Sequence, residues 1–214
     1  MLEQLKKEVV RIAKLADDNG LCKHGSGNFS IRDEDSGYIV ITPSAVSRDE
    51  LTYEHVCVID LDGKIIEKME SVRPSSESLM HLEVYKTRSD LKSIAHTHSK
   101  FATTFAVLDK EIPPITYESI AYGAKLPIAP YGRPGTVDLA KSIVEPLKES
   151  DCCLMSKHGV LATSVNNLYD AFLKAVYIEE VAEIYYRAIT INPGIGGISQ
   201  DEFDKWAYPE EIGQ

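Results

Sequence analysis

Two histidines one residue apart, His96 and His98, are the residues of this 214-residue chain best suited to metal chemistry. They follow the apolar residues Leu91, Ile94 and Ala95, which predict a buried strand that ends at the pair. Side chains alternate along a strand, so residues at i and i+2 point to the same face. Two imidazoles placed side by side in this way suit a divalent transition metal.

A third histidine and a glutamate could complete such a site. His158 follows the apolar strand predicted at Asp151–Met155 and precedes Gly159, where a tight turn is expected. Together with the histidine pair it would form a three-histidine site with an open fourth position, as catalytic zinc sites have. Glu77 begins a predicted helix, either as an acid favoured by the helix dipole or as a base or fourth ligand near the metal.

Three polar segments could bind the phosphate group of a substrate. The serines of Ser75-Ser76 lie at the start of the predicted helix, where backbone N–H groups point outward and suit an anion. The loops Gly25–Asn28 and Thr42–Ala45 flank predicted strands and could present N–H, amide and hydroxyl groups to phosphate. Ordinary turn chemistry would explain both loops equally well.

The remaining histidines are interpreted as structural or surface residues: His24, His55 and His81. His81 follows Glu77 by four residues, so the two side chains would meet on the surface of the predicted helix.

The elements that must position these residues are helices and short strands. Helices are predicted by apolar residues three and four apart at Leu2–Asp18, Pro74–Arg88, Lys100–Leu108, Val137–Lys148 and Asn166–Ala188. Further strands are predicted at Asn28–Arg32, Tyr38–Thr42, His55–Leu61, Lys64–Glu67 and Leu126–Ala129. The early meander of strands favours a mixed sheet over a doubly wound parallel one. We expect one α/β domain over residues 1–214, with an irregular tail after about Pro193.

Composition narrows the function classes. The net charge of −10 argues against a nucleic-acid binder, which would need a basic face. No apolar run reaches the length of a membrane span, and the first residues do not resemble a signal peptide. The four cysteines show no CxxC spacing, so reduced thiols in the cytoplasm are the simplest interpretation.

Five motifs occur in the order and spacing of the class II aldolase/adducin family: Gly27-Asn28-Phe29-Ser30, Thr42-Pro43-Ser44, Pro74-Ser75-Ser76-Glu77, His96-Thr97-His98 and Lys157-His158-Gly159. The chain resembles this family from the first helix to about Pro193, and within it the L-fuculose-1-phosphate aldolases most. The resemblance implies a three-layer α/β/α fold around a mixed, largely antiparallel sheet. It also implies a homotetramer that cleaves a sugar phosphate with a divalent metal.

The resemblance assigns roles to individual residues. It implies one Zn²⁺ per subunit, held by His96, His98 and His158, with Glu77 as catalytic base and as a possible fourth ligand without substrate. Tyr117 falls where these aldolases carry a tyrosine that protonates the aldehyde oxygen. The implied phosphate pocket consists of Gly27, Asn28, Ser44, Ala45, Ser75 and Ser76. Family members usually have glycine at the position of Ala45. Tyr208 is the counterpart of a tyrosine that reaches a neighbouring subunit's site.

Other functions of the same fold stay open. An aldolase for 5-deoxyribulose or methylthioribulose 1-phosphate would share all of this chemistry. A methylthioribulose-1-phosphate dehydratase uses an acidic residue one position from Glu118, and ranks second. A ribulose-phosphate 4-epimerase is disfavoured, because its Gly-Thr-Thr-His-Ala-Asp stretch is missing. An adducin-like scaffold would lack the metal histidines, which are present here.

Overall fold

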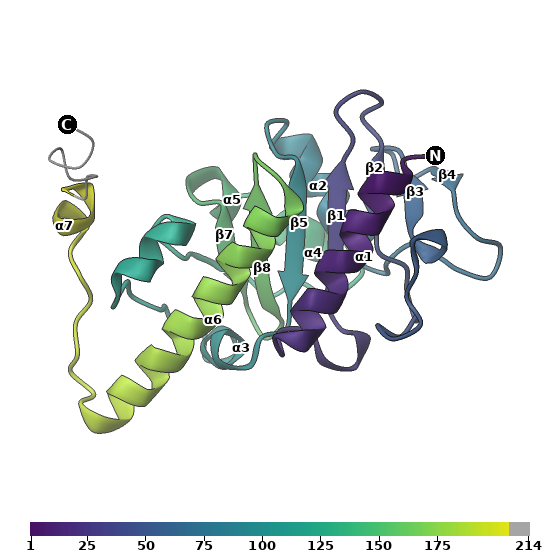
Figure 1. The fold of residues 1–214 in the computed structure, drawn as a ribbon. Helices are drawn as coiled ribbons and strands as arrows, with labels where there is room; N and C mark the ends of the chain where they lie inside the picture. The colour runs from purple at the N-terminus through teal and green to yellow at the C-terminus, as the bar shows by residue number, and fades with distance from the viewer. Residues whose placement is uncertain (206–214) are drawn as a thin grey trace, which may run out of the picture.

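The computed structural model describes residues 1–205 and is organised around one sheet of eight strands (Figure 1). The strands are β1 (Asn28–Arg32), β2 (Ile39–Ile41), β3 (Cys57–Ile59), β4 (Ile65–Glu67), β5 (Ser93–Thr97), β6 (Ile128–Ala129), β7 (Cys152–Met155) and β8 (Gly159–Ser164). Their order is β4-β3-β2-β1-β5-β8-β7-β6. Among the strand pairs of residues 1–205, only β6–β7 is parallel, which confirms the mixed, largely antiparallel sheet.

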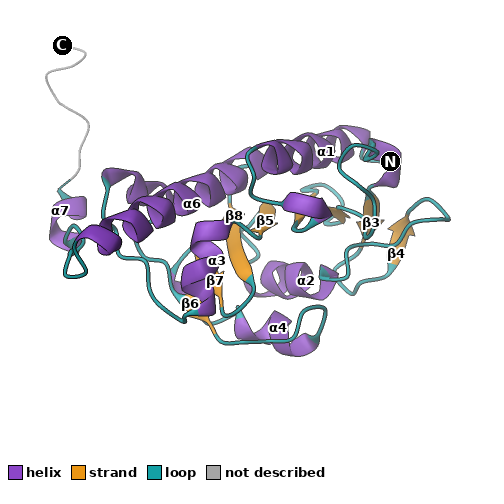
Figure 2. Ribbon diagram, turned by 90° about the horizontal axis from the view of Figure 1, so that it is seen from below, coloured by secondary structure: helices purple, strands orange, loops and turns teal. Residues whose placement is uncertain are grey.

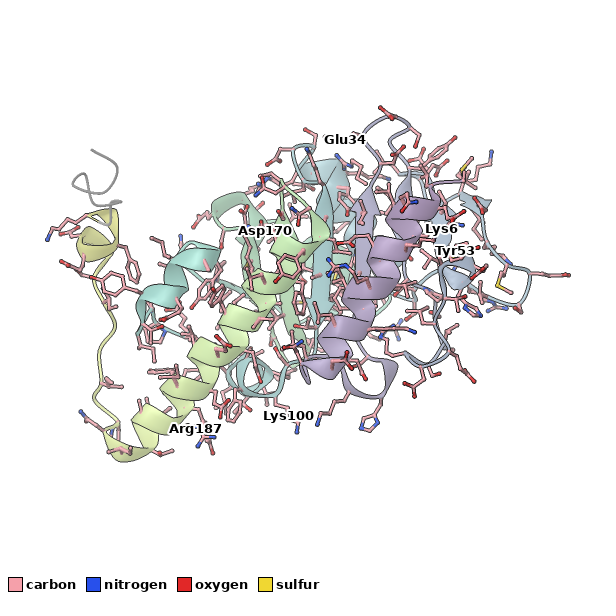
Figure 3. All side chains as sticks on the ribbon, in the orientation of Figure 1. Lys6, Glu34, Tyr53, Lys100, Asp170 and Arg187 are labelled. Carbon is pink, nitrogen blue, oxygen red and sulfur yellow. The ribbon has the colours of Figure 1, made fainter. Side chains whose placement is uncertain are left out.

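Helices cover both faces of the sheet and complete the three layers (Figure 2). They are α1 (Glu3–Asp18), α2 (Ser78–Thr87), α3 (Lys100–Val107), α4 (Val137–Ser142), α5 (Pro146–Glu149), α6 (Leu168–Ile191) and α7 (Gln200–Asp204). In Figure 2, α1 and α6 lie on one side of the strands, and α2 and α4 lie on the other. Charged side chains such as Glu34, Lys100 and Arg187 project from the surface (Figure 3).

Two apolar cores lie between these layers, and β5 contributes to both. Ile94 belongs to the core beneath α2 and α4, and Ala95 to the core beneath α1 and α6. This alternation follows from the two-residue period of a strand. His96, two residues after Ile94, therefore faces the same layer as α2.

The helix predicted to open at Pro74-Ser75-Ser76 begins instead at Ser78, with Glu77 at its N-cap position. Backbone hydrogen bonds hold the preceding residues in place: Ser75 N donates to Thr42 O, and Ser44 N donates to Arg73 O. The segment therefore pairs with the loop after β2 and cannot enter the helix. The predicted start of this helix at Pro74–Ser76 was wrong.

Three further boundaries differ from prediction. The helix expected over Val137–Lys148 is divided into α4 and α5, because Pro146 lacks the N–H that a continuous helix requires. The predicted strand from His55 is shorter, since His55 ends a 3-10 turn at Tyr53–His55. The tail after Pro193, expected to be irregular, contains the short helix α7.

Candidate active site

Four side chains converge where β5 ends: Glu77, His96, His98 and His158. One ligand atom from each lies within 4.8 Å of the others. His96 is at the end of β5, His98 follows that strand, and His158 occupies the turn between β7 and β8. The structure thus brings together all four residues that the sequence selected as candidate metal ligands or base.

The turn that carries His158 fits closely against the other two histidines. Strand β8 pairs with β5, with Val160 opposite Thr97, so the turn before β8 lies beside the end of β5. A Cβ atom on Gly159 would overlap the Thr97 carbonyl oxygen and touch the rings of His96 and His98. Glycine is therefore required there for the three imidazoles to meet.

Nitrogen and oxygen atoms crowd together in the cluster. His96 Nδ1 donates to Val160 O at 2.9 Å, so Nε2 is the ring nitrogen that faces the other side chains. His96 Nε2 is 2.9 Å from His98 Nε2 and 3.2 Å from Glu77 Oε2. Burial, with the neighbouring imidazoles, lowers the pKa of His98 to about 3 and keeps that ring neutral.

A divalent cation would reconcile these contacts. His98 can relieve only one of the close approaches to His96 by donating a proton, whereas a cation among the four ligand atoms would relieve all of them. Three imidazoles and a carboxylate match the ligand set of catalytic zinc sites. The carbonyl that holds His96 Nδ1 is the kind of outer partner that fixes a metal-binding tautomer.

Glu77 is held at one oxygen and open at the other. Asn28 Nδ2 donates to Glu77 Oε2 at 2.8 Å. Oε1 is buried, lies 3.2 Å from His158 Nε2 and accepts no hydrogen bond from a described residue. Burial acts to raise the pKa of Glu77, but the imidazoles of His158 and His96 outweigh it and hold this pKa well below its usual range. Glu77 is therefore a carboxylate with one oxygen available.

A cavity of about 380 Å³ opens beside the cluster. It is lined by all six residues of the expected phosphate pocket: Gly27, Asn28, Ser44, Ala45, Ser75 and Ser76. Ser44 Oγ accepts from Ser76 N at 2.9 Å, which ties two of the loops together. Glu77, His98 and His158 line the same cavity. The four-residue cluster and the three polar segments thus share one cavity.

Sequence reasoning missed several residues around this cavity. Pro134-Gly135 lines it from a loop that carried no signal of its own. Arg48 lies behind it, and its Nη2 donates to Ser26 O and Gly27 O at 2.9 Å each. His81, interpreted as a structural or surface residue, is fully buried and contacts Asn28. The expected contact with Glu77 on the helix surface was wrong, because Glu77 lies before the first turn of α2.

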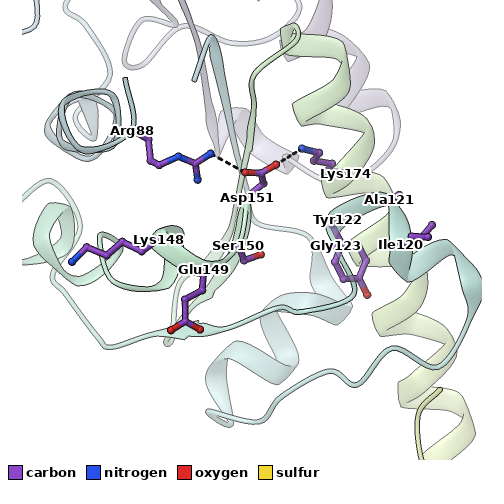
Figure 4. A pocket seen from close by; sticks show the side chains of 10 residues that line it. All are labelled: Arg88, Ile120, Ala121, Tyr122, Gly123, Lys148, Glu149, Ser150, Asp151 and Lys174. Carbon is purple, nitrogen blue, oxygen red and sulfur yellow. Dashed lines mark hydrogen bonds and ion pairs between the residues drawn. The ribbon is translucent and has the colours of Figure 1, made fainter. Parts of the chain in front are cut away.

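A second hollow, of about 560 Å³, lies at the opposite end of β7 (Figure 4). Its charged groups are already paired, since Asp151 contacts both Arg88 and Lys174. Lys148 pairs with Glu145 in the same way. The ion pairs join α2, β7 and α6 around the hollow, so we interpret it as a structural junction between these elements.

Comparison with known proteins decides the family. The sequence-family model for the class II aldolase and adducin N-terminal domain matches residues 7–186 of this chain. The chain belongs to the class II aldolase and adducin family. A 5-deoxy-D-ribulose 1-phosphate aldolase of Bacillus thuringiensis serovar kurstaki is 36% identical over 192 residues, covering 90% of this chain and 89% of the relative. An L-fuculose phosphate aldolase of Escherichia coli K12 is 33% identical, covering 86% and 83%.

Solved structures agree with this assignment. An L-fuculose 1-phosphate aldolase superposes with a TM-score of 0.88 at 30% identity, covering 94% of this chain and 93% of the other. The protein is a lyase of the class II aldolase kind, and class II aldolases depend on a metal. Within residues 1–205, none of the helices combines the length and the apolar character needed to cross a bilayer.

In this class II aldolase, Tyr117 is not among the residues that line the cavity. Tyr117 begins the 3-10 helix Tyr117–Tyr122, is about half exposed, and contacts α7. Its ring packs edge-on against Phe203, and its hydroxyl donates to Glu202 at 3.4 Å. A catalytic role for Tyr117 therefore stays a prediction. Tyr208 lies outside the described residues.

Ala45 stands in a left-handed backbone conformation, with φ of 59°. In this conformation a Cβ atom destabilises the folded state by roughly 1–2 kcal/mol. Glycine avoids this strain, but the greater backbone freedom of its unfolded chain lowers the free energy of unfolding by about 0.4–1 kcal/mol. We expect Ala45→Gly to raise the free energy of unfolding by about 0.5–1 kcal/mol in urea denaturation. Ala188→Gly, in the last turn of α6, is the matched control and should lower it by up to about 1 kcal/mol. Destabilisation by Ala45→Gly would contradict the strain at this residue.

Proposed function

We propose that this protein is a zinc-dependent aldolase that reversibly cleaves a ketose 1-phosphate, with L-fuculose 1-phosphate as the first candidate. The products are dihydroxyacetone phosphate and a short aldehyde, L-lactaldehyde for this substrate. The observation that carries the proposal is the shared cavity, where the Glu77–histidine cluster lies beside the three loops. A sugar phosphate needs such a pair of neighbouring sites to place its carbonyl group near a metal.

His96, His98 and His158 would hold the zinc ion, with Glu77 as a fourth ligand when no substrate is present. When bound, the ion would act as a Lewis acid that stabilises negative charge on the substrate's carbonyl oxygen. The loops would bind the phosphate through Gly27, Asn28, Ser44, Ala45, Ser75 and Ser76. They would orient the bond to be broken toward the open oxygen of Glu77.

Glu77 would transfer the proton at the reacting carbon of dihydroxyacetone phosphate. In cleavage, the bond between the third and fourth carbons breaks, and its electron pair stays with the phosphate-bearing half. Glu77 Oε1 would first take up a proton from solvent and would then transfer it to the third carbon, which balances the proton lost from the hydroxyl on the fourth carbon. A second group takes the proton from the hydroxyl that becomes the aldehyde, the role predicted for Tyr117. Each such acid or base contributes roughly 10²–10⁴-fold in rate.

Arg48 would support phosphate binding from behind the loops. Its buried guanidinium links the carbonyls of Ser26 and Gly27 and carries the positive charge nearest to them. We expect Arg48→Met to weaken inhibition by inorganic phosphate roughly tenfold, because a hydrogen bond to a charged group is worth about 1.5–3 kcal/mol. Arg48→Lys keeps the charge and should lose less. An unchanged inhibition constant in Arg48→Met would show that the loops bind phosphate without it.

A second substrate has equal support from the comparisons. The Bacillus relative is named for 5-deoxy-D-ribulose 1-phosphate, and its 36% identity is close to the 33% of the Escherichia coli enzyme. Both substrates would leave dihydroxyacetone phosphate in the same half of the site. They differ in the aldehyde, which would be acetaldehyde for the second.

A substrate screen separates these candidates. The zinc-loaded protein is assayed for dihydroxyacetone phosphate release from L-fuculose 1-phosphate, 5-deoxy-D-ribulose 1-phosphate and methylthioribulose 1-phosphate. We expect release from at least one, with the highest kcat/KM marking the substrate. Loss of water from methylthioribulose 1-phosphate without carbon–carbon cleavage would favour the dehydratase alternative. Absence of bound zinc and of all cleavage would favour an adducin-like scaffold.

We also propose a cytoplasmic homotetramer. All four cysteines are buried free thiols, as expected in a reducing compartment. Exposed apolar side chains along the second half of α6 offer surface for contact with other copies: Ile184, Tyr186 and Ile191. Sedimentation equilibrium of the purified protein measures the assembly state directly.

A further inference from the structure

A line of buried polar side chains runs from Glu77 into the space between β1 and α2. Asn28 Nδ2 contacts Glu77 Oε2 at 2.8 Å, and Asn28 Oδ1 contacts His81 Nε2 at 2.5 Å. His81 Nδ1 then contacts Ser30 Oγ at 2.7 Å, and Ser30 Oγ contacts Tyr85 Oη at 2.9 Å. His81, Ser30 and Tyr85 are all at most 1% exposed. None of these three touches the cavity, so the proposed reaction leaves them unexplained.

The direction of each hydrogen bond in this line follows from its two ends. Glu77 is a carboxylate and can only accept, so the Asn28 amide must turn its Nδ2 toward it. Asn28 Oδ1 then faces His81 and can only accept as well. His81 Nε2 must therefore carry a proton and donate it.

The same reasoning fixes the rest of the line. Burial lowers the pKa of His81 to about 3, so the ring is neutral and carries one proton. With that proton on Nε2, Nδ1 is bare and accepts from the Ser30 hydroxyl. Because the Ser30 hydroxyl proton goes to His81, the single hydroxyl proton of Tyr85 is shared between Ser30 Oγ at 2.9 Å and Ser30 O at 3.2 Å. Every donor in the line thus points toward Glu77.

We propose that His81 is a positioning residue that locks the Asn28 amide with its N–H toward Glu77. Ser30 and Tyr85 hold His81 in the required tautomer. A flipped Asn28 amide would set its oxygen against Glu77 Oε2, and the carboxylate would have to turn. With the lock in place, Oε2 is occupied and Oε1 faces the reacting carbon. This role rests on the proposed function of Glu77 as base.

Two substitutions at His81 separate positioning from simple packing. His81→Gln keeps an N–H near the Nε2 position, whereas His81→Leu removes it and leaves Asn28 Oδ1 unpaired. We expect His81→Leu to lower kcat roughly 10- to 100-fold, the usual effect of losing an outer partner at such a site, with KM and zinc content unchanged. His81→Gln should stay within about threefold of the natural protein. His55→Leu, at a histidine that contacts Thr52 in a turn, is the control and should leave kcat, KM and zinc content unchanged.

The opposite results would overturn the proposal. Equal losses of kcat in His81→Leu and His81→Gln would show a packing role, and loss of zinc in His81→Leu would assign His81 to metal retention. A fully active His81→Leu variant would show that His81 does not position Asn28 and Glu77 for catalysis.

A measurement on the natural protein needs neither variant to fold. Nitrogen-15 NMR of histidine-labelled, zinc-loaded protein reports which ring nitrogen of each histidine carries the proton. We expect His81 to be protonated at Nε2 and bare at Nδ1. A proton on Nδ1 would overturn the proposal. If the protein cleaves no ketose 1-phosphate, the proposed function fails, while the tautomer of His81 still decides the direction of the lock.

Discussion

Glu77→Gln is expected to retain zinc on its three histidines and to lose roughly 10²–10⁴-fold in kcat, the range for removal of a positioned acid or base. Glutamine keeps the shape of the side chain, and Asn28 can still donate to its oxygen. The histidines keep three ligand nitrogens for the ion. What disappears is the open carboxylate oxygen Oε1, which has no hydrogen-bond partner among the described residues and would carry the proton.

Zinc content by atomic absorption and release of dihydroxyacetone phosphate are measured on the same preparation of Glu77→Gln. Exchange of the dihydroxyacetone phosphate proton with deuterated water gives a second readout and should fall in parallel. A variant with Glu83→Gln, in the helix that follows Glu77 and away from the cluster, is the matched control. Full turnover by Glu77→Gln would contradict its assignment as the base.

His158→Ala is expected to weaken zinc binding by more than 100-fold, because loss of an outer partner already costs about 10–100-fold and this residue is a ligand. His158 alone among the three histidines comes from the turn before β8, so its removal opens the cluster on one side. Activity should fall with zinc occupancy and recover in part at high zinc concentration.

Competition with a fluorescent zinc chelator measures the dissociation constant of His158→Ala. His24→Ala, at a histidine outside the cluster, serves as the control for a general loss of histidine. Zinc affinity in His158→Ala equal to that of the natural protein would contradict a three-histidine site.

The cluster of Glu77 and three histidines could be predicted from sequence because its geometry is largely local. His96 and His98 share a face through the strand period alone. His158 needed one further condition, that the strand after it pairs with β5, and the apolar run of β7 with its tight turn made that expectation reasonable. The layer order and the mixed sheet followed from the early meander of strands together with the family resemblance.

The residues behind Glu77 could not be predicted, because their contacts depend on long-range register. Asn28 lies opposite His96 in the β1–β5 pair, and Ser30 lies opposite Ile94, which places both beneath α2. Nothing in the spacing of His81 to Glu77 indicates this. The spacing suggested a surface pair, since the sequence does not reveal that Glu77 stays outside the helix.

Two other differences have local physical causes that sequence patterns describe poorly. Pro146 sits within a continuous apolar period, and its missing N–H divides the helix that the period predicts. Arg48 is a charged residue in a polar stretch, and only the folded loop shows that it is buried against Ser26 and Gly27.

The most direct test is the zinc dependence of carbon–carbon cleavage by the natural protein. Purified protein is treated with a chelator, dialysed, and assayed for dihydroxyacetone phosphate release from L-fuculose 1-phosphate and 5-deoxy-D-ribulose 1-phosphate, before and after one equivalent of zinc per chain is restored. We expect release to vanish with the metal and to return with it on at least one of the two substrates. Cleavage that persists in fully metal-free protein, or zinc-loaded protein that cleaves neither substrate, would contradict a zinc-dependent ketose 1-phosphate aldolase.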